Sequence, residues 1–375
     1  MSVRDAGAAS AGGDDTTRRP PAGRFVPALR VALLPWLALH AVLGASLLVV
    51  LALEGGRFPA AGDGPGARGL FAWDGGWYRG IATSGYDGVS PEARRFFPLL
   101  PLLGRAVGWL VGDTLGLWMV ASGCALLYLA AVAVLASRLL PGPDAAVRAT
   151  WTAALIPGST ALVLPYTEAL AGLLTVAFFL LLERRRAGPA LMVGALAALA
   201  RPTGILLVVP ALLARALRVP GRFVAAAGPL VGTAALMMYS AASAGDWSAP
   251  WTQQTDSELR GGLLLNPLPG IWRNDSGGIT PPVTLLLVAV AVWLLVRTFR
   301  TLPVAYGAWS LAVLVPSVCS VDAHSLPRYV AGIVPLVLVL STAPSSPRAF
   351  RWLLGVSTVL SLVLTTVWVQ GRVVP

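Results

Sequence analysis

Long apolar runs dominate the sequence and restrict it to folds that a lipid bilayer can surround. Hydrophobic residues make up 56% of the 375 residues, and charged residues make up only 12%. A water-soluble domain of this length would need a far larger charged surface. A membrane-spanning helix, in contrast, needs about 20 mainly apolar residues. We therefore expect an all-α, polytopic membrane protein.

The apolar runs divide the chain into about eleven transmembrane or partly spanning helices. Several are short, so we expect some of these helices to be broken or tilted. Polar residues 1–24 predict a disordered cytoplasmic tail, and 25–375 a single transmembrane domain with two long outer loops, 54–97 and 243–279. The apolar segments are 31–53, 115–138, 150–165, 166–183, 187–200, 203–216, 222–242, 280–297, 302–319, 329–342 and 352–370.

The arginines predict the orientation, because cytoplasmic loops carry an excess of basic residues. All 28 basic residues are arginine, and a cytoplasmic N-terminus places 17 of them inside with five acids. The other side then keeps 11 basic and 12 acidic residues. This assignment requires two short legs that meet at Arg201-Pro202, where proline breaks the helix. One continuous helix over 187–216 would reverse the orientation of everything after it.

The first outer loop contains the most informative sequence, WDGGWY. Trp73, Trp77, Tyr78 and Ile81 fall at helical spacing and predict an interfacial helix with its apolar face on the membrane. Asp74 stands at the start of this helix. The acid either caps the helix or faces a lipid-linked substrate, for which the following glycines would leave room.

Four blocks resemble a known family. WDGGWYRGIATSGY followed by FFPLLPLL is similar to the PIG-V type mannosyltransferases of the GT-C superfamily, in their bacterial branch. The similarity continues in PYTEAL (165–170), ARPTGI (200–205) and PRYVAGIVPL (327–336). The sequence departs from the family pattern at Leu100, where tyrosine is expected, and at Ala72, where arginine often precedes the WD pair.

The resemblance implies a GT-C type fold and an inverting transfer of a hexose, with mannose implied by the family, from a polyprenyl-phosphate donor. Asp74 matches the catalytic base, and a carboxylate can take the proton of an attacking hydroxyl. Holding the leaving phosphate requires cationic groups, for which Arg201, Arg328 and His324 are the outer-face candidates. We expect no metal and no cofactor. The substrate-pocket candidates are Trp73, Trp77, Tyr78, Tyr166 and Glu168.

Several of these residues also have a purely structural interpretation. Arg201 can cap a broken helix, Arg328 can reach lipid head groups, His324 can be a solvated turn residue, and Tyr166 can anchor the membrane interface. Glu168 lies between two apolar runs, which is costly unless it is paired, and its predicted partner is Arg201. His40 is expected to form a hydrogen bond between helices.

The expected partners are the membrane, a polyprenyl-phosphate sugar as donor, and an extracytoplasmic glycan, lipid or protein as acceptor. Nucleic acid is not expected, because the arginines form no continuous basic face. We predict a multi-pass protein of the cell membrane with its active site on the extracytoplasmic face. Two alternatives stay open: a transporter or lipid-glycan flippase, and a non-catalytic subunit of a glycosylation complex.

Overall fold

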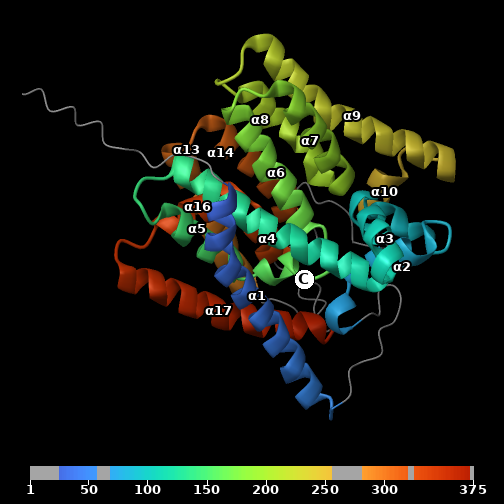
Figure 1. Cartoon of the computed structure of the whole chain (residues 1–375), viewed down its shortest axis with the longest axis horizontal. Coiled ribbons are helices and arrows are strands. Elements are labelled where there is room, and N and C mark those ends of the chain that lie inside the picture. The colour runs from blue at the N-terminus through green and yellow to red at the C-terminus, as the bar shows by residue number, and fades with distance from the viewer. Residues whose placement is uncertain (1–24, 57–67, 256–280, 320–324, 372–375) are drawn as a thin grey trace, which may run out of the picture.

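The computed structural model describes residues 25–56, 68–255, 281–319 and 325–371, which form a bundle of helices (Figure 1). Among these residues there is no β-strand, so the all-α prediction is confirmed for them. The predicted tail, 1–24, lies outside the described residues. The helices are α1 (Phe25–Leu53), η1 (Gly69–Phe71), α2 (Asp74–Ser84), η2 (Pro91–Arg95), α3 (Leu99–Val111), α4 (Asp113–Leu139), α5 (Ala145–Leu155), η3 (Ser159–Leu162), α6 (Glu168–Glu183), α7 (Ala187–Ala200), η4 (Pro202–Leu207), α8 (Val208–Leu213), α9 (Val219–Ala244), α10 (Ala249–Thr255), α13 (Pro281–Thr301), α14 (Val304–Val318), α15 (Leu326–Gly332), α16 (Val334–Thr342) and α17 (Pro347–Val369).

Helices α1, α4, α9, α13 and α17 are each long and apolar enough to cross a membrane. Large apolar side chains on their outer surfaces stay exposed, among them Leu34, Leu286 and Trp352. Exposed apolar side chains on so many long apolar helices suit contact with lipid tails. The chain is therefore a multi-pass membrane protein.

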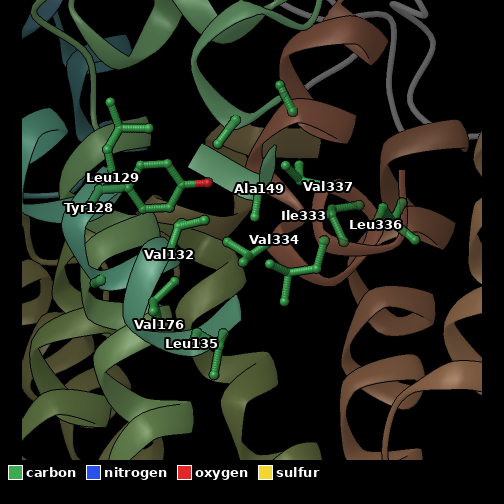
Figure 2. Close-up of a cluster of buried hydrophobic side chains, with 14 of the residues drawn as sticks. Tyr128, Leu129, Val132, Leu135, Ala149, Val176, Ile333, Val334, Leu336 and Val337 are labelled. Atoms are coloured by element: carbon green, nitrogen blue, oxygen red, sulfur yellow. The ribbon is translucent and has the colours of Figure 1, made fainter. Parts of the chain in front are cut away.

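Helix α4 lies at the centre of the bundle. Its side chains Tyr128, Leu129, Val132 and Leu135 are fully buried. Figure 2 shows them beside Ala149 of α5, Val176 of α6 and the start of α16. The core thus joins helices from the middle and last thirds of the chain, and so it fixes the relative positions of the segments that carry the charged residues described below.

The break predicted at Arg201-Pro202 is confirmed. Helix α7 ends at Ala200, Arg201 is extended (φ −160°, ψ 151°), and η4 begins at Pro202. The chain then reverses so tightly that a Cβ on Gly204 would lie 2.1 Å from the carbonyl oxygen of Ala197. Two short legs therefore meet at Arg201, as the orientation argument requires.

Two further apolar segments are interrupted, in each case at a proline. The segment predicted at 150–165 forms α5 only to Leu155, because Ile156 adopts the extended conformation favoured before Pro157. The segment predicted at 329–342 divides at Ile333 into α15 and α16, with Pro335 in the first turn of α16.

Between the predicted first outer loop and α4 lies an additional helix, α3, that we had not predicted. Helices α3 and α4 pack closely because glycines face each other: a Cβ on Gly104 would lie 2.8 Å from Leu117 Cδ1, and one on Gly116 would lie 2.5 Å from the Gly104 carbonyl oxygen. The opposite side of α3 exposes Trp109 and Leu110, as an interfacial helix would.

The apolar face of α2 does not lie on the membrane, and this part of the prediction is wrong. Trp77, Tyr78 and Ile81 are buried in a protein cluster that includes Leu100 of α3 and Leu117 of α4. The spacing correctly indicated a helix with one apolar face. It could not indicate that α3 and α4 would cover that face instead of lipid.

Candidate functional site

Four charged side chains that are far apart in the sequence meet at one end of the bundle. They are Asp74 at the start of α2, Glu168 at the start of α6, Arg201 between α7 and η4, and Arg328 in α15. We call this group the charged cluster. With two acids and two arginines it is formally neutral, and its members come from four segments that the core holds in place.

Glu168 and Arg328 each join two partners within the charged cluster. Glu168 Oε1 accepts from Arg201 Nη1 at 2.5 Å and lies 3.2 Å from Arg328 Nε. Arg328 Nη1 donates to Asp74 Oδ2 at 2.7 Å. The predicted pairing of Glu168 with Arg201 is thus confirmed. Charged groups removed from water are stable only when paired in this way.

The backbone around Asp74 is held from both sides of the helix start. The indole N–H of Trp73 donates to the carbonyl of Trp368 in α17 at 3.1 Å. The Tyr166 hydroxyl donates to the carbonyl of Ala72 at 2.8 Å. Trp73 itself has a positive φ of 54°, which is rare for a bulky residue. These contacts aim the Asp74 carboxylate toward Arg328.

The glycine after Asp74 does not leave room for a substrate, contrary to our expectation. A Cβ on Gly75 would lie 3.1 Å from Pro165 Cγ and 3.3 Å from Tyr166 Cε1. The space is therefore already filled by the loop that precedes α6. Gly75 allows α2 to approach that loop and so brings Asp74 close to Glu168.

A second glycine, Gly158, allows the backbone of Arg328 to approach. Its φ is +96°, and a Cβ there would lie 2.5 Å from the Pro327 carbonyl group and 2.7 Å from the backbone nitrogen of Arg328. Only glycine fits this conformation in this space. The turn between α5 and η3 therefore determines where Arg328 stands.

The charged cluster borders a cavity of about 480 Å³, and all four of its members line it. Beyond Glu168 the wall continues along α6 through Ala171 and Gly172 to Thr175, and along α14 through Val313 to Trp309. Glu168 and Thr175 are seven positions apart along α6, which corresponds to a rise of about 10 Å. The cavity therefore has a charged end and a mainly apolar limb that runs into the bundle.

A second wall of the cavity is formed by η2 and α10, which belong to the two predicted outer loops. Arg95 is the last residue of η2 and Phe96 directly follows it. The other residues of this wall lie on α10 and are Trp251, Thr252 and Gln254. Gln254 Nε2 donates to the Arg95 carbonyl at 2.6 Å, which fixes α10 against η2. This wall places aromatic and polar side chains beside the charged end of the cavity.

Aromatic rings lie close to both arginines. The Arg328 guanidinium carbon lies 5.5 Å from the Tyr166 ring centroid and 5.2 Å from the Tyr329 ring centroid. The Arg201 guanidinium carbon lies 5.5 Å from the same Tyr329 ring centroid. Such contacts favour a cation in a dry site. On the other side of the cluster, the Tyr78 hydroxyl lies 3.4 Å from Thr167 Oγ1.

The Tyr78 hydroxyl is uncharged at neutral pH. Burial raises the pKa of Tyr78 well above its ordinary value, and the negative charge of Asp74 raises it further. Tyr78 can therefore donate a hydrogen bond to a ligand in the cavity, but it cannot act as a base there. Asp74 and Glu168 remain as the acids of the site.

The predicted site residues occupy different positions relative to the cavity. Asp74, Arg201, Arg328, Tyr78 and Glu168 line it. Trp73 and Tyr166 instead support the backbone next to Asp74. The ring of Trp77 stacks on Phe96 with centroids 5.6 Å apart.

One predicted residue cannot be placed, and several cavity residues had not been predicted. His324 lies outside the described residues. Thr167 and Tyr329 line the cavity although we had not singled them out. The signal was present for both, because Thr167 stands inside the PYTEAL block and Tyr329 inside the PRYVAGIVPL block.

Comparison of the chain with family models, with curated proteins and with solved structures finds no match. In the described part of the chain, no group of three or more His, Cys, Asp or Glu side chains is arranged to hold a metal ion.

Proposed function

We propose that this chain is a membrane glycosyltransferase that transfers a hexose from a polyprenyl-phosphate donor to an extracytoplasmic acceptor with inversion. The observation that carries the proposal is the position of the charged cluster at the mouth of an apolar limb. A lipid-phosphate sugar needs cations for its phosphate, an apolar channel for its chain and a base near its sugar. The cavity is lined by two arginines, by the apolar limb and by the Asp74 carboxylate, which would meet these three needs.

Arg201 and Arg328 are the residues that would hold the phosphate. Both are fixed by Glu168, at 2.5 Å and 3.2 Å. Guanidinium groups bind phosphate oxygens through paired N–H donors. As the bond to the sugar breaks, the phosphate gains negative charge, and cations already in place stabilise that charge without reorganisation.

Asp74 is the residue that would act as general base. The hydroxyl oxygen of the acceptor attacks the anomeric carbon on the face opposite the phosphate. The bond from that carbon to the phosphate oxygen breaks, its electron pair leaves with the lipid phosphate, and the hydroxyl proton moves to the Asp74 carboxylate. One attack from the opposite face inverts the anomeric configuration. The sugar as mannose follows from the sequence resemblance alone.

The apolar limb would take the first part of the isoprenoid chain. Its walls on α6 and α14 include Gly172, Val313 and Pro316, which present little polarity to a hydrocarbon. Burial of apolar surface contributes about 25 cal/mol per Å². The limb would therefore favour a lipid-linked donor over a free sugar phosphate.

The test is a transfer assay with purified protein in vesicles, using radiolabelled polyprenyl-phosphate mannose and an acceptor pool extracted from membranes. The proposal expects label to leave the donor and appear in a product of opposite anomeric configuration. Movement of intact donor across the vesicle membrane without product would instead identify a carrier. Transfer only in the presence of a co-purified second protein would identify a non-catalytic subunit.

A further inference from the structure

Arg328 occupies a position between the two acids of the charged cluster. Its Nη1 contacts Asp74 Oδ2 at 2.7 Å, and its Nε lies 3.2 Å from Glu168 Oε1. Both contacts come from one guanidinium, so a change in the position of Arg328 affects both acids. The pair with Asp74 spans 254 residues of sequence, and both residues line the cavity.

The two acids differ in how accessible they are. The Glu168 side chain is 5% exposed and that of Arg328 only 3%, whereas that of Asp74 is 17% exposed. Of the two acids that contact Arg328, Asp74 is thus the more accessible to a ligand in the cavity, which both acids line. Among the contacts described, the one with Asp74 is therefore the one that an incoming anion would replace.

We propose that the phosphate of the donor and the carboxylate of Asp74 compete for Arg328, so that donor binding breaks the Arg328–Asp74 contact. This inference rests on the proposed function and adds a binding order to it: donor first, acceptor second. A carboxylate held by a guanidinium accepts a proton less readily than one that has lost this contact. Asp74 thus becomes an effective base only after the phosphate is in place.

Glu168 is a positioning residue in this scheme. It keeps its contacts with Arg201 and Arg328 before and after the phosphate enters, so the two guanidinium groups need not be assembled by the donor. Ordering these side chains in advance reduces the entropy lost on binding. The same arrangement prevents the free site from presenting an unpaired buried cation.

The experiment measures the affinity of a short-chain isoprenyl phosphate for the purified full chain in lipid nanodiscs by calorimetry. The variants are Asp74→Asn, Arg328→Gln and the double variant. Asp87→Asn is the matched control, because Asp87 is also an acid of the first outer loop facing an arginine, Arg94 at 4.0 Å, but its side chain is 89% exposed.

Competition predicts that Asp74→Asn binds the isoprenyl phosphate about tenfold more tightly than the wild type, while Asp87→Asn binds it equally well. Arg328→Gln should weaken binding, and in that background Asp74→Asn should give no further gain. Such non-additivity is what a double-mutant cycle detects between groups that share a partner.

An unchanged or weakened affinity in Asp74→Asn would overturn the inference. So would a gain that persists in the Arg328→Gln background, because it would reflect only the removal of a negative charge. Asp74→Ser serves as a second variant if Asp74→Asn does not fold. Absence of binding to the wild type would contradict the proposed function as well, whereas binding without the predicted gain would contradict only this inference.

Discussion

The two ends of the helix bundle both carry arginines, but their surroundings differ. Helix α6 begins at Glu168 in the charged cluster and ends at Glu183 beside the exposed Arg184, Arg185 and Arg186. At the first end, Arg328 is buried, Arg201 is largely buried, and both are paired with acids. At the other end, Arg184, Arg185 and Arg186 stay at the surface.

This difference separates arginines that orient a membrane protein from arginines that form a site. Exposed basic residues near helix ends bias the topology at little energetic cost. Removing an ion from water costs several kcal/mol even after relaxation, and replacing a buried ion pair by apolar residues is often neutral or stabilising. A buried cluster is therefore weak evidence for stability. Since it lines the cavity, we attribute it to function.

The largest expected effect is an all-or-none difference in labelling between the two ends. In a chain with Cys124 and Cys319 replaced by serine, Asp87→Cys should react with a membrane-impermeant maleimide on intact cells. Arg184→Cys should react only after permeabilisation, because the arginine distribution places it inside. Labelling of both positions in intact cells would contradict the proposed orientation.

Substitution of a buried arginine should affect stability far more than substitution of an exposed one. Arg328→Gln leaves Asp74 and Glu168 without this partner, so we expect the free energy of unfolding to fall by about 3–5 kcal/mol. The control Arg215→Gln, at an exposed loop position, should stay within about 0.5 kcal/mol of the wild type. Reversible unfolding in mixed micelles measures both. Equal effects would show that Arg328 has no special surroundings.

A smaller effect is expected at Gly158, whose close contact with the Pro327–Arg328 backbone positions Arg328. Gly158→Ala combines a positive φ with a close contact to the Pro327–Arg328 backbone, so we expect a loss of about 1–3 kcal/mol and weaker binding of isoprenyl phosphate. Gly142→Ala is the matched control, because its φ is +94° and a Cβ there has open space. A similar loss of binding in both variants would argue against this positioning role.

The smallest expected effect concerns the approach of α2 to the loop before α6. Gly75→Ala adds a Cβ 3.1 Å from Pro165, which neighbours can accommodate by small shifts, and alanine also favours the helix. We expect a change in stability below about 1 kcal/mol together with a severalfold loss of transfer activity, since Asp74 would move. Gly44→Ala, with open space at its Cβ, should change neither.

Local patterns predicted the parts of the site that depend on a few consecutive residues. Spacing placed a helix start at Asp74, proline chemistry placed the reversal at Arg201, and the cost of an unpaired intramembrane acid indicated the Glu168–Arg201 pair. The hydrogen bonds predicted for His40 between helices are confirmed too, at 2.9 Å to Ser122 of α4. Each of these conclusions rests on short-range geometry or on one energetic rule.

The contacts that complete the site could not be predicted in this way. The Arg328–Asp74 pair depends on the turn at Gly158, a segment distant in sequence from both residues. This turn packs against the backbone at Pro327–Arg328 and so positions α15 for the contact with Asp74. Helix α3 covers the apolar face of α2 because glycines allow it to pack on α4. Periodicity indicates that a face is apolar, but it does not indicate whether lipid or protein will cover it.

The central claim is that Asp74 takes the proton of the acceptor in a hexosyl transfer from a lipid phosphate. The most direct test compares transfer by the wild type, Asp74→Asn and Asp87→Asn in the same vesicles with the same radiolabelled donor. Loss of the base should reduce transfer by about 10²–10⁴-fold in Asp74→Asn, with protein insertion intact and Asp87→Asn unaffected. Transfer at the wild-type rate by Asp74→Asn would contradict the account.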